Sequence, residues 1–322
     1  MANITVAGRM YRLLAALALA TTAMHHAHAQ EKYPTRPVEV IVPWGPGGGA
    51  DQTGRIVAKL LEGELKVSFP VINVPGATGN TGMAKLLNAP ADGYSVAILT
   101  ADTYATQTTS TPKWTLKDII PVAVMIKQPS GLYVAGNSPL KSWAEVEKEG
   151  RSRPLKVAIS GLGSPDEITV NFFNSRGMKL TAVPYAKPGE RYTAILGGHA
   201  DLLYSPVGNI KTYVDGGQMR PVLFLSPDRL AGFADTPTSK QLGYEILLPQ
   251  FRALVVRAGT DPARVKFLAD ALARVYEHAD YKKFLKDATG SDDSYEAGPK
   301  AVSFMQGELD AMKKALAAVG GK

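Results

Sequence analysis

The chain has 322 residues, a formal net charge of +7 and no cysteine. The missing thiols exclude disulfides, thiolate catalysis, iron–sulfur clusters and cysteine-based zinc sites. The basic residues are spread along the chain rather than clustered, so the charge indicates an acidic ligand and argues against nucleic acid as a partner.

Residues 1–29 have the pattern of a secretory signal peptide. Arg9 and Arg12 precede an apolar run, and an Ala-His-Ala cleavage pattern ends at Ala29. We expect cleavage near Ala29 and a periplasmic mature protein, whose formal charge falls from +7 to +5 without the two arginines. The apolar run is short for a membrane span, and a retained anchor is the alternative. No later run is as long, so we expect a soluble mature chain without membrane insertion.

Residues 30–322 are more than one hydrophobic core usually serves, so we expect two lobes. Strand patterns alternate with helical patterns along the chain, which predicts an α/β fold with mainly parallel sheets. The first part has predicted strands over 38–42, 70–74 and 95–100 and predicted helices over 51–65 and 79–87.

A second series of elements begins after residues 129–139. It has predicted strands over 156–160, 180–184, 200–205 and 220–226 and predicted helices over 167–176, 190–197 and 210–216. A predicted strand over 251–257 and predicted helices over 261–277, 280–288 and 299–319 follow. This order suggests that the C-terminal helices complete the first lobe.

The loop between the first predicted strand and helix is rich in glycine. It reads Pro43-Trp44-Gly45-Pro46-Gly47-Gly48-Gly49-Ala50-Asp51. Glycines let a ligand approach the main chain, and a helix start offers unpaired N–H groups and a positive dipole end. The loop therefore predicts an anion site, with a tight turn that binds nothing as the alternative. We expect Asp51 to cap its own helix, because its charge would repel an anion, and Asp166 to cap the helix after residues 161–164.

Enzyme classes with glycine-rich loops fit less well. Gly45, Gly47 and Ala50 match a relaxed dinucleotide fingerprint, which leaves a nicotinamide-dependent oxidoreductase as a remote alternative. That fingerprint needs an acidic residue at the end of the second strand, and residues 72–75 contain none. A phosphate-binding P-loop lacks its lysine, and residues 160–164 lack the nucleophile elbow of a serine hydrolase.

Eight short motifs follow the predicted signal peptide. The first is the glycine-rich loop, and the second is Asn73-Val74-Pro75-Gly76-Ala77-Thr78-Gly79-Asn80-Thr81-Gly82. The others occupy residues 91–94, 161–164, 183–185, 196–201, 236–238 and 242–244. In order and spacing, over nearly all of residues 30–322, these motifs resemble the periplasmic receptors of tripartite tricarboxylate transporters, the Bug/TctC family.

The resemblance implies a periplasmic binding fold similar to type II. Such a fold has two lobes, each a mainly parallel sheet flanked by helices, with the ligand cleft between them. Lobe 1 is expected to be discontinuous, with residues 30–131 and 253–322, and lobe 2 to contain residues 132–252. The chain then crosses between the lobes near 128–135 and 249–256, and two crossings make a hinge.

The implied function is capture of a small organic carboxylate by clamshell closure and its delivery to the membrane permease subunits of the transporter. The acid is a mono- or dicarboxylate, aliphatic or aromatic. We expect a monomer that is not an enzyme and has no catalytic residue, cofactor or metal. A receptor that reports ligand occupancy to a signalling partner has the same sequence features and is the alternative.

The resemblance also implies which residues contact the ligand. In this family the first two loops hold one carboxylate, largely through main-chain N–H groups and ordered water. The corresponding residues are Trp44, Gly47, Gly48, Gly49 and Ala50 in the first loop and Gly76, Ala77, Thr78, Gly79 and Asn80 in the second. Further expected contacts are Thr100, Ala101 and Asp102, which end the third strand, and Gly163, Ser164, Tyr185, Tyr204 and Ser205 in the second lobe.

Some of these side chains have two interpretations. Trp44 could stack on an aromatic acid or simply form a wall. Tyr204 and Ser205 stand where many family members have an acidic or amide residue, which argues against amino-group recognition and leaves hydroxyl donors for a second carboxylate. We interpret Lys187 and Arg191 as exposed basic residues rather than as partners of a distal carboxylate.

Overall fold

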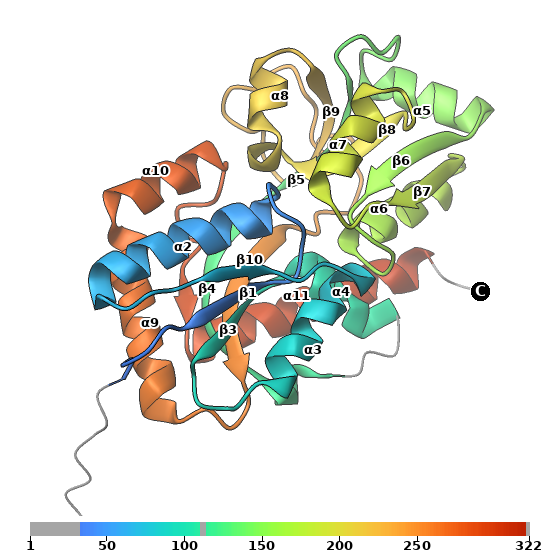
Figure 1. Cartoon of the computed structure of the whole chain (residues 1–322). Coiled ribbons are helices and arrows are strands. Elements are labelled where there is room, and N and C mark those ends of the chain that lie inside the picture. The colour runs from blue at the N-terminus through green and yellow to red at the C-terminus, as the bar shows by residue number, and fades with distance from the viewer. Residues whose placement is uncertain (1–32, 110–113, 320–322) are drawn as a thin grey trace, which may run out of the picture. The chain divides into compact units, whose positions relative to one another are not determined.

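The computed structural model describes residues 33–109 and 114–319 of the chain (Figure 1). The chain divides into two units, Met1–Thr35 and Arg36–Lys322. The predicted signal peptide and its cleavage site lie outside the described residues, and the fold below is that of the second unit. Within the described ranges, no helix has both the length and the apolar character needed to cross a membrane.

The described residues form two sheets, of which sheet A has the strand order β11-β4-β10-β3-β1-β2 (Figure 1). Its strands are β1 (Glu39–Val42), β2 (Val71–Asn73), β3 (Ser95–Thr100), β4 (Ile119–Gln128), β10 (Gln250–Arg257) and β11 (Glu296–Ala297). The central strands are continuous apolar runs, such as Val96-Ala97-Ile98-Leu99, with successive residues buried. Such runs are typical of a sheet that is covered on both faces.

Sheet B has the strand order β7-β6-β8-β5-β9. Its strands are β5 (Ser130–Ala135), β6 (Leu155–Ile159), β7 (Leu180–Pro184), β8 (Leu202–Pro206) and β9 (Met219–Leu225). β6 runs parallel to β7 and β8, whereas β5 is antiparallel to β8 and β9.

Both sheets are mixed, which corrects the expectation of mainly parallel sheets. In sheet A, β1 is parallel to β2 and β3, but β10 is antiparallel to β3 and β4, and β11 is antiparallel to β4. The reason is the chain path. β4 leads out of sheet A through Pro129 into β5, and β10 brings the chain back beside β4, so the two strands run in opposite directions.

Ten helices of at least five residues are present in the described part of the chain. Those around sheet A are α2 (Gly49–Leu65), α3 (Asn80–Asn88), α4 (Ala101–Thr109), α9 (Pro262–Glu277), α10 (Ala279–Asp287) and α11 (Pro299–Val319). Those around sheet B are α5 (Trp143–Ser152), α6 (Pro165–Asn174), α7 (Pro188–Leu196) and α8 (Lys211–Asp215). Single 3₁₀ turns are η1 (Ala77–Gly79), η2 (Leu116–Asp118) and η3 (Val207–Asn209). We call sheet A with its helices part A, and sheet B with its helices part B.

Several elements were not predicted from the sequence. α4, β4, β5 and α5 lie between residues 101 and 152, for which the sequence predicts no strand or helix. Ala101 and Asp102 begin α4 rather than end β3. β5 follows Pro129 and contains Gly131, and such residues usually mark loops. Burial outweighs that signal here, because every residue of β5 is buried.

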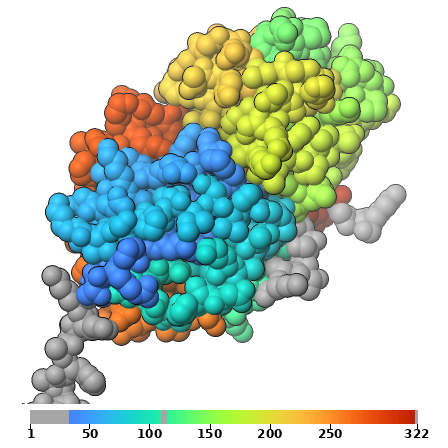
Figure 2. Space-filling view, viewed as in Figure 1, coloured from blue at the N-terminus to red at the C-terminus, as the bar shows by residue number. Residues whose placement is uncertain are grey.

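Part A and part B are in direct contact. Thr78 Oγ1 in part A donates a hydrogen bond to the carbonyl oxygen of Leu162 in part B, at 2.9 Å. Arg252 Nη2 on β10 donates to Asn209 Oδ1 in η3 at 3.0 Å. On the face shown in Figure 2, the blue surface of the N-terminal elements meets the yellow-green surface of part B.

Candidate ligand-binding site

A small cavity lies where part A and part B meet. Its volume is about 40 Å³, which is room for a few water molecules. Part A contributes Trp44, Gly48, Gly49, Ala50, Thr100, Asp102 and Arg252, and part B contributes Ser160, Tyr185, Ala186, Pro188, Arg191 and Asn209. Most of these residues follow a strand or begin a helix, which is where open α/β sheets bind ligands.

The first glycine-rich loop brings the start of α2 to this cavity. Gly47 has a φ of +82°, a left-handed conformation that favours glycine, and Gly48 is the N-cap residue. The first intrahelical bond runs from the amide of Gln52 to the carbonyl of Gly48, at 2.9 Å. The amides of Gly49 and Ala50 therefore precede the helical bonding pattern at the cavity wall, where the helix dipole is positive.

Asp51 holds this loop from behind and does not line the cavity. Its Oδ2 accepts hydrogen bonds from the Gly47 amide and from Arg55 Nε, both at 3.0 Å, and its Oδ1 accepts from Asn73 Nδ2 at 2.9 Å. Burial favours the neutral acid, but the hydrogen bonds from Arg55, Gly47 and Asn73 outweigh it and hold the pKa of Asp51 below its ordinary value. Asp51 was predicted to cap α2, but the N-cap residue is Gly48. The Asp51 carboxylate instead accepts the amide of Gly47 in the preceding loop.

Gly48 and Gly49 are glycines because other groups lie against them. A Cβ on Gly48 would be 2.5 Å from Pro188 Cγ, which belongs to part B. A Cβ on Gly49 would be 2.0 Å from Arg252 Nη2 and 2.2 Å from Asn209 Oδ1. A side chain at either position therefore collides with the walls of the cavity.

Trp44 is buried and serves as a wall of the cavity. Its Nε1 donates a hydrogen bond to Thr100 Oγ1 at 3.1 Å, so the indole is held at the end of β3. Asp102, in the first turn of α4, accepts a hydrogen bond from Gln250 Nε2 at 2.7 Å. The hydrogen bond to Thr100 thus fixes the orientation of the Trp44 indole.

Arg252 supplies a buried positive charge from the middle of sheet A. It is only 4% exposed, and its guanidinium donates Nη1 to Gln128 Oε1 and Nη2 to Asn209 Oδ1. Burial lowers the pKa of Arg252 to about 10, so the group remains protonated at neutral pH. Sequence reasoning missed this residue, although a lone charge inside the apolar run of β10 was a usable signal.

Arg191 supplies a second buried charge, from α7. The interpretation of this residue as exposed is wrong, because it is only 7% exposed and lines the cavity. It lies three residues after Pro188, and residues at that spacing share one face of a helix. Burial alone would lower the pKa of Arg191, but Tyr192, Asp166 and Asp102 raise it above its ordinary value. Lys187 is exposed as predicted and pairs with Glu190 at 3.0 Å.

Asp166 supports Ser160 rather than capping α6. Its Oδ2 accepts hydrogen bonds from the Ser160 amide at 2.8 Å and from Ser160 Oγ at 2.6 Å. Burial raises the pKa of Asp166 well above its ordinary value, and the nearby charge of Asp102 adds to the effect. The N-cap of α6 is Ser164, whose Oγ accepts from the Glu167 amide, so the predicted cap at Asp166 is wrong.

The second glycine-rich loop does not reach the cavity. Positive φ angles at Gly76 (136°), Thr78 (52°) and Gly79 (86°) turn it toward the loop after β6. Thr78 bonds the Leu162 carbonyl there, and a Cβ on Gly161 would lie 2.5 Å from Thr78 Oγ1. The loop is a contact between the two parts.

The other predicted contact residues fall into two groups. The cavity brings together Trp44, Gly48, Gly49, Ala50, Thr100, Asp102 and Tyr185. The residues that do not line it are Gly47, Gly76, Ala77, Thr78, Gly79, Asn80, Ala101, Gly163, Ser164, Tyr204 and Ser205. Two of these side chains form hydrogen bonds elsewhere: Asn80 Oδ1 accepts from Trp114 Nε1 at 2.8 Å, and Ser164 Oγ donates to the Gly161 carbonyl at 2.6 Å. Tyr204 is enclosed in β8, where burial raises its pKa.

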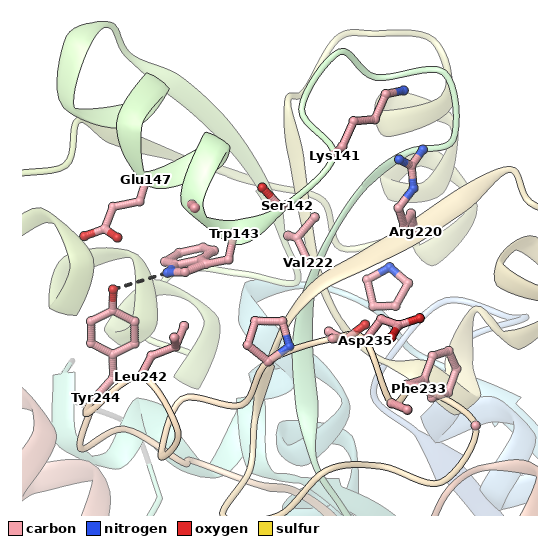
Figure 3. Close-up of a pocket in the computed structure, with 16 residues that line it drawn as sticks. Lys141, Ser142, Trp143, Glu147, Arg220, Val222, Phe233, Asp235, Leu242 and Tyr244 are labelled. Atoms are coloured by element: carbon pink, nitrogen blue, oxygen red, sulfur yellow. Dashed lines mark hydrogen bonds between the residues drawn. The ribbon is translucent and has the colours of Figure 1, made fainter.

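A larger cavity, of about 720 Å³, lies on part B beside β9 and α5 (Figure 3). Trp143 and Tyr244 face each other there, with a hydrogen bond of 3.2 Å from the indole Nε1 to the phenol oxygen. Its rim carries charges of both signs, Arg220 and Asp235 among them. All of its walls come from part B, so it does not depend on the contact between the parts.

Comparison with known proteins decides the family. Residues 54–320 match the family model of the TctC receptor, described as the tripartite tricarboxylate transporter family receptor. The chain belongs to this family. BugT of Bordetella pertussis is 30% identical over 271 residues, which are 80% of this chain and 82% of that protein.

Solved structures share the receptor's fold. R. palustris Rpa4515 with adipate matches at a TM-score of 0.83 with 24% identity, over 89% of this chain and 98% of that one. MatC from Rhodopseudomonas palustris with bound malate matches at a TM-score of 0.81 with 21% identity, over 88% and 100%. The predicted α/β periplasmic binding fold with two lobes is therefore confirmed.

This family consists of solute-binding receptors of transporters, not of enzymes. The nicotinamide-dependent oxidoreductase is thereby excluded, and the receptor has a solute-binding role in transport. Among the described residues, no three His, Cys, Asp or Glu side chains gather as metal ligands do.

Proposed function

We propose that this receptor binds a small organic carboxylate in the cavity between part A and part B, closes on it and delivers it to the membrane permease of a tripartite transporter. The observation that carries the proposal is the convergence of the α2 start, Arg191 and Arg252 on one cavity. Free helical amides and guanidinium groups are the usual binding partners of carboxylates.

We propose that lobe 1, residues 30–131 with 253–322, corresponds to part A and that lobe 2, residues 132–252, corresponds to part B. At the crossings the sheets differ from these bounds by a few residues, because β10 joins sheet A from Gln250 and β5 joins sheet B from Ser130. The proposed hinge lies where β4 passes into β5 and where the chain returns to β10. Closure is the functional step, because a cavity of about 40 Å³ holds only a few water molecules, and the two parts must move apart to take in an acid of several carbons. Separation of the two parts exposes the walls that bind the ligand.

The ligands of structural relatives support an organic acid as the solute. R. palustris Rpa4515 is described with adipate and MatC with bound malate. We propose an acid of this size range for the present receptor. Export through the predicted signal peptide, with cleavage near Ala29, places it in the periplasm.

A thermal-shift screen of the purified protein tests the proposal. The panel contains citrate, malate, succinate, adipate, nicotinate, benzoate and terephthalate, with NADH and inorganic phosphate as controls. A ligand at about 100 times its dissociation constant adds about 2.7 kcal/mol, which raises the melting temperature by several degrees. We expect at least one carboxylate to do so. A response to NADH or phosphate alone contradicts the proposal.

Uptake measurements test the delivery step. Cells that express receptor and permease should take up the radiolabelled acid, and deletion of either gene should abolish uptake. Uptake that persists without the receptor, together with a lost transcriptional response to the acid, would instead identify a sensor.

A further inference from the structure

The two arginines of the cavity differ in how well their guanidinium groups are satisfied. Arg252 donates to both Gln128 and Asn209. Arg191 Nη1 lies 3.9 Å from Asp166 Oδ2, which is too long for a hydrogen bond. Its Nε has no hydrogen-bond partner among the described residues. Since a guanidinium has five N–H donors, Arg191 retains donors for a further group.

Asp166 does not fully compensate the charge of Arg191. Its Oδ2 already accepts both the amide and the hydroxyl of Ser160. Arg191 therefore stays charged beside Asp166 and Asp102, and its Nε, unpartnered among the described residues, leaves a donor for a carboxylate from outside the protein.

The opposite wall of the cavity has its own anion position. The amides of Gly49 and Ala50 lie at the start of α2 in part A, whereas Arg191 lies on α7 in part B. The two walls meet closely, since Gly48 leaves no room for a Cβ against Pro188. A molecule with an acid group at each end satisfies both walls at once.

We propose that Arg191 is the specificity-determining residue of this receptor and binds the second acid group of a ligand that has two. The receptor then prefers dicarboxylates to monocarboxylates of the same chain length. Asp102 also lines the cavity and repels a carboxylate near the end of β3, which directs the second acid group toward Arg191. This inference rests on the proposed function, the binding of an organic acid in this cavity.

Isothermal titration calorimetry on matched ligand pairs tests the inference. The pairs are succinate with butyrate and adipate with hexanoate, which differ in one acid group. Hydrogen bonds to charged groups lead us to expect about 10- to 100-fold tighter binding of the favoured dicarboxylate than of its monoacid partner. Arg191→Met should remove that preference, because it should weaken the binding of the dicarboxylate much more than that of its monoacid partner. Arg191→Lys should recover it only in part, because lysine lacks the bidentate fork.

Lys187→Met is the matched control, because Lys187 is a neighbouring cation that is exposed and paired with Glu190. It should change neither affinity, and circular dichroism checks the fold of all variants. Where Arg191→Met does not fold, Arg191→Lys decides the question, because it keeps the positive charge and loses the bidentate fork. Equal binding of both members of each pair, or equal loss of both in Arg191→Met, overturns the inference and leaves carboxylate binding intact. Failure of every acid to bind overturns the proposed function and the inference together.

Discussion

The two glycine-rich loops of part A resemble each other in sequence but differ in what they do. Each follows a parallel strand of sheet A and precedes a helix, and both were expected to hold a carboxylate. The first brings the start of α2 to the cavity, with Gly48 and Gly49 against Pro188 and Arg252. The second bonds the Leu162 carbonyl through Thr78 and lies outside the cavity. A glycine-rich pattern therefore indicates that another group packs closely against the main chain. Which group this is decides whether the loop lines the cavity or joins the two parts.

The loops also differ in what anchors them. The ionised carboxylate of Asp51 fixes the first loop through Gly47, Arg55 and Asn73. The second loop is fixed by neutral hydrogen bonds, such as that of Asn80 with Trp114. The stability that the anchor of the first loop contributes should thus depend on pH, and that of the second loop should not.

Gly48→Val should have the largest effect on ligand binding. The new side chain collides with Pro188 only when part A and part B are together, and overpacking of this kind costs about 1–3 kcal/mol. We expect affinity for every acid to fall by about 10- to 100-fold in calorimetry. The melting temperature of the ligand-free protein should change little, and unchanged affinity would falsify the assignment of the first loop to the site.

Gly49→Val is a companion variant, because its side chain collides with Arg252 within part A as well as with Asn209 of part B. This variant should lose both affinity and stability in urea unfolding. If both variants behave alike, Pro188 does not act as a closure contact.

Asp51→Asn should lower the free energy of unfolding by about 1–2 kcal/mol at pH 7, since charge-assisted hydrogen bonds are lost. The folded protein holds the pKa of Asp51 below the ordinary value of 3.8, so this stability is present above that value and is lost as the pH falls through the lowered folded pKa. The difference between wild type and variant should shrink between pH 5 and pH 2 in urea titrations. A difference that does not depend on pH argues against a charged anchor.

Thr78→Val should have the smallest effect. It removes the hydrogen bond to Leu162, worth about 0.5–1.5 kcal/mol, while retaining the shape of the side chain. We expect affinity to fall by about 2- to 10-fold and equally for mono- and dicarboxylates, because closure and not ligand contact is weakened. A loss for one ligand class alone would assign Thr78 to the ligand.

Local patterns predicted most elements of the fold, since the apolar strands and the glycine and proline boundaries agree with the structure. The prediction failed between residues 101 and 152. β4 contains Pro121 and β5 contains Gly131, and both residues interrupt a strand pattern. The mixed sheets could not be predicted either, because strand direction depends on where the chain crosses between the sheets.

The site was harder to predict than the fold. The first loop and Asp102 could be found from position alone, because strand ends and helix starts gather at one edge of a sheet. Arg252 was missed although a lone charge inside an apolar strand marks it. Arg191 could not be found, because its burial arises from contacts between residues far apart in the chain. An arginine on a helix is ordinarily solvated, and no local pattern distinguishes Arg191 from Lys187.

The strands that carry the chain between the sheets pair with each other as far as Gln128 and Gln250. Such a paired ribbon bends more readily across its plane than it shears within it, so for the proposed closure we expect rotation of the parts about one axis. Gln128 and Gln250 also contact Arg252 and Asp102, the charged residues of part A at the cavity. A single side chain on each strand therefore connects the charged residues of the proposed ligand site with the proposed hinge.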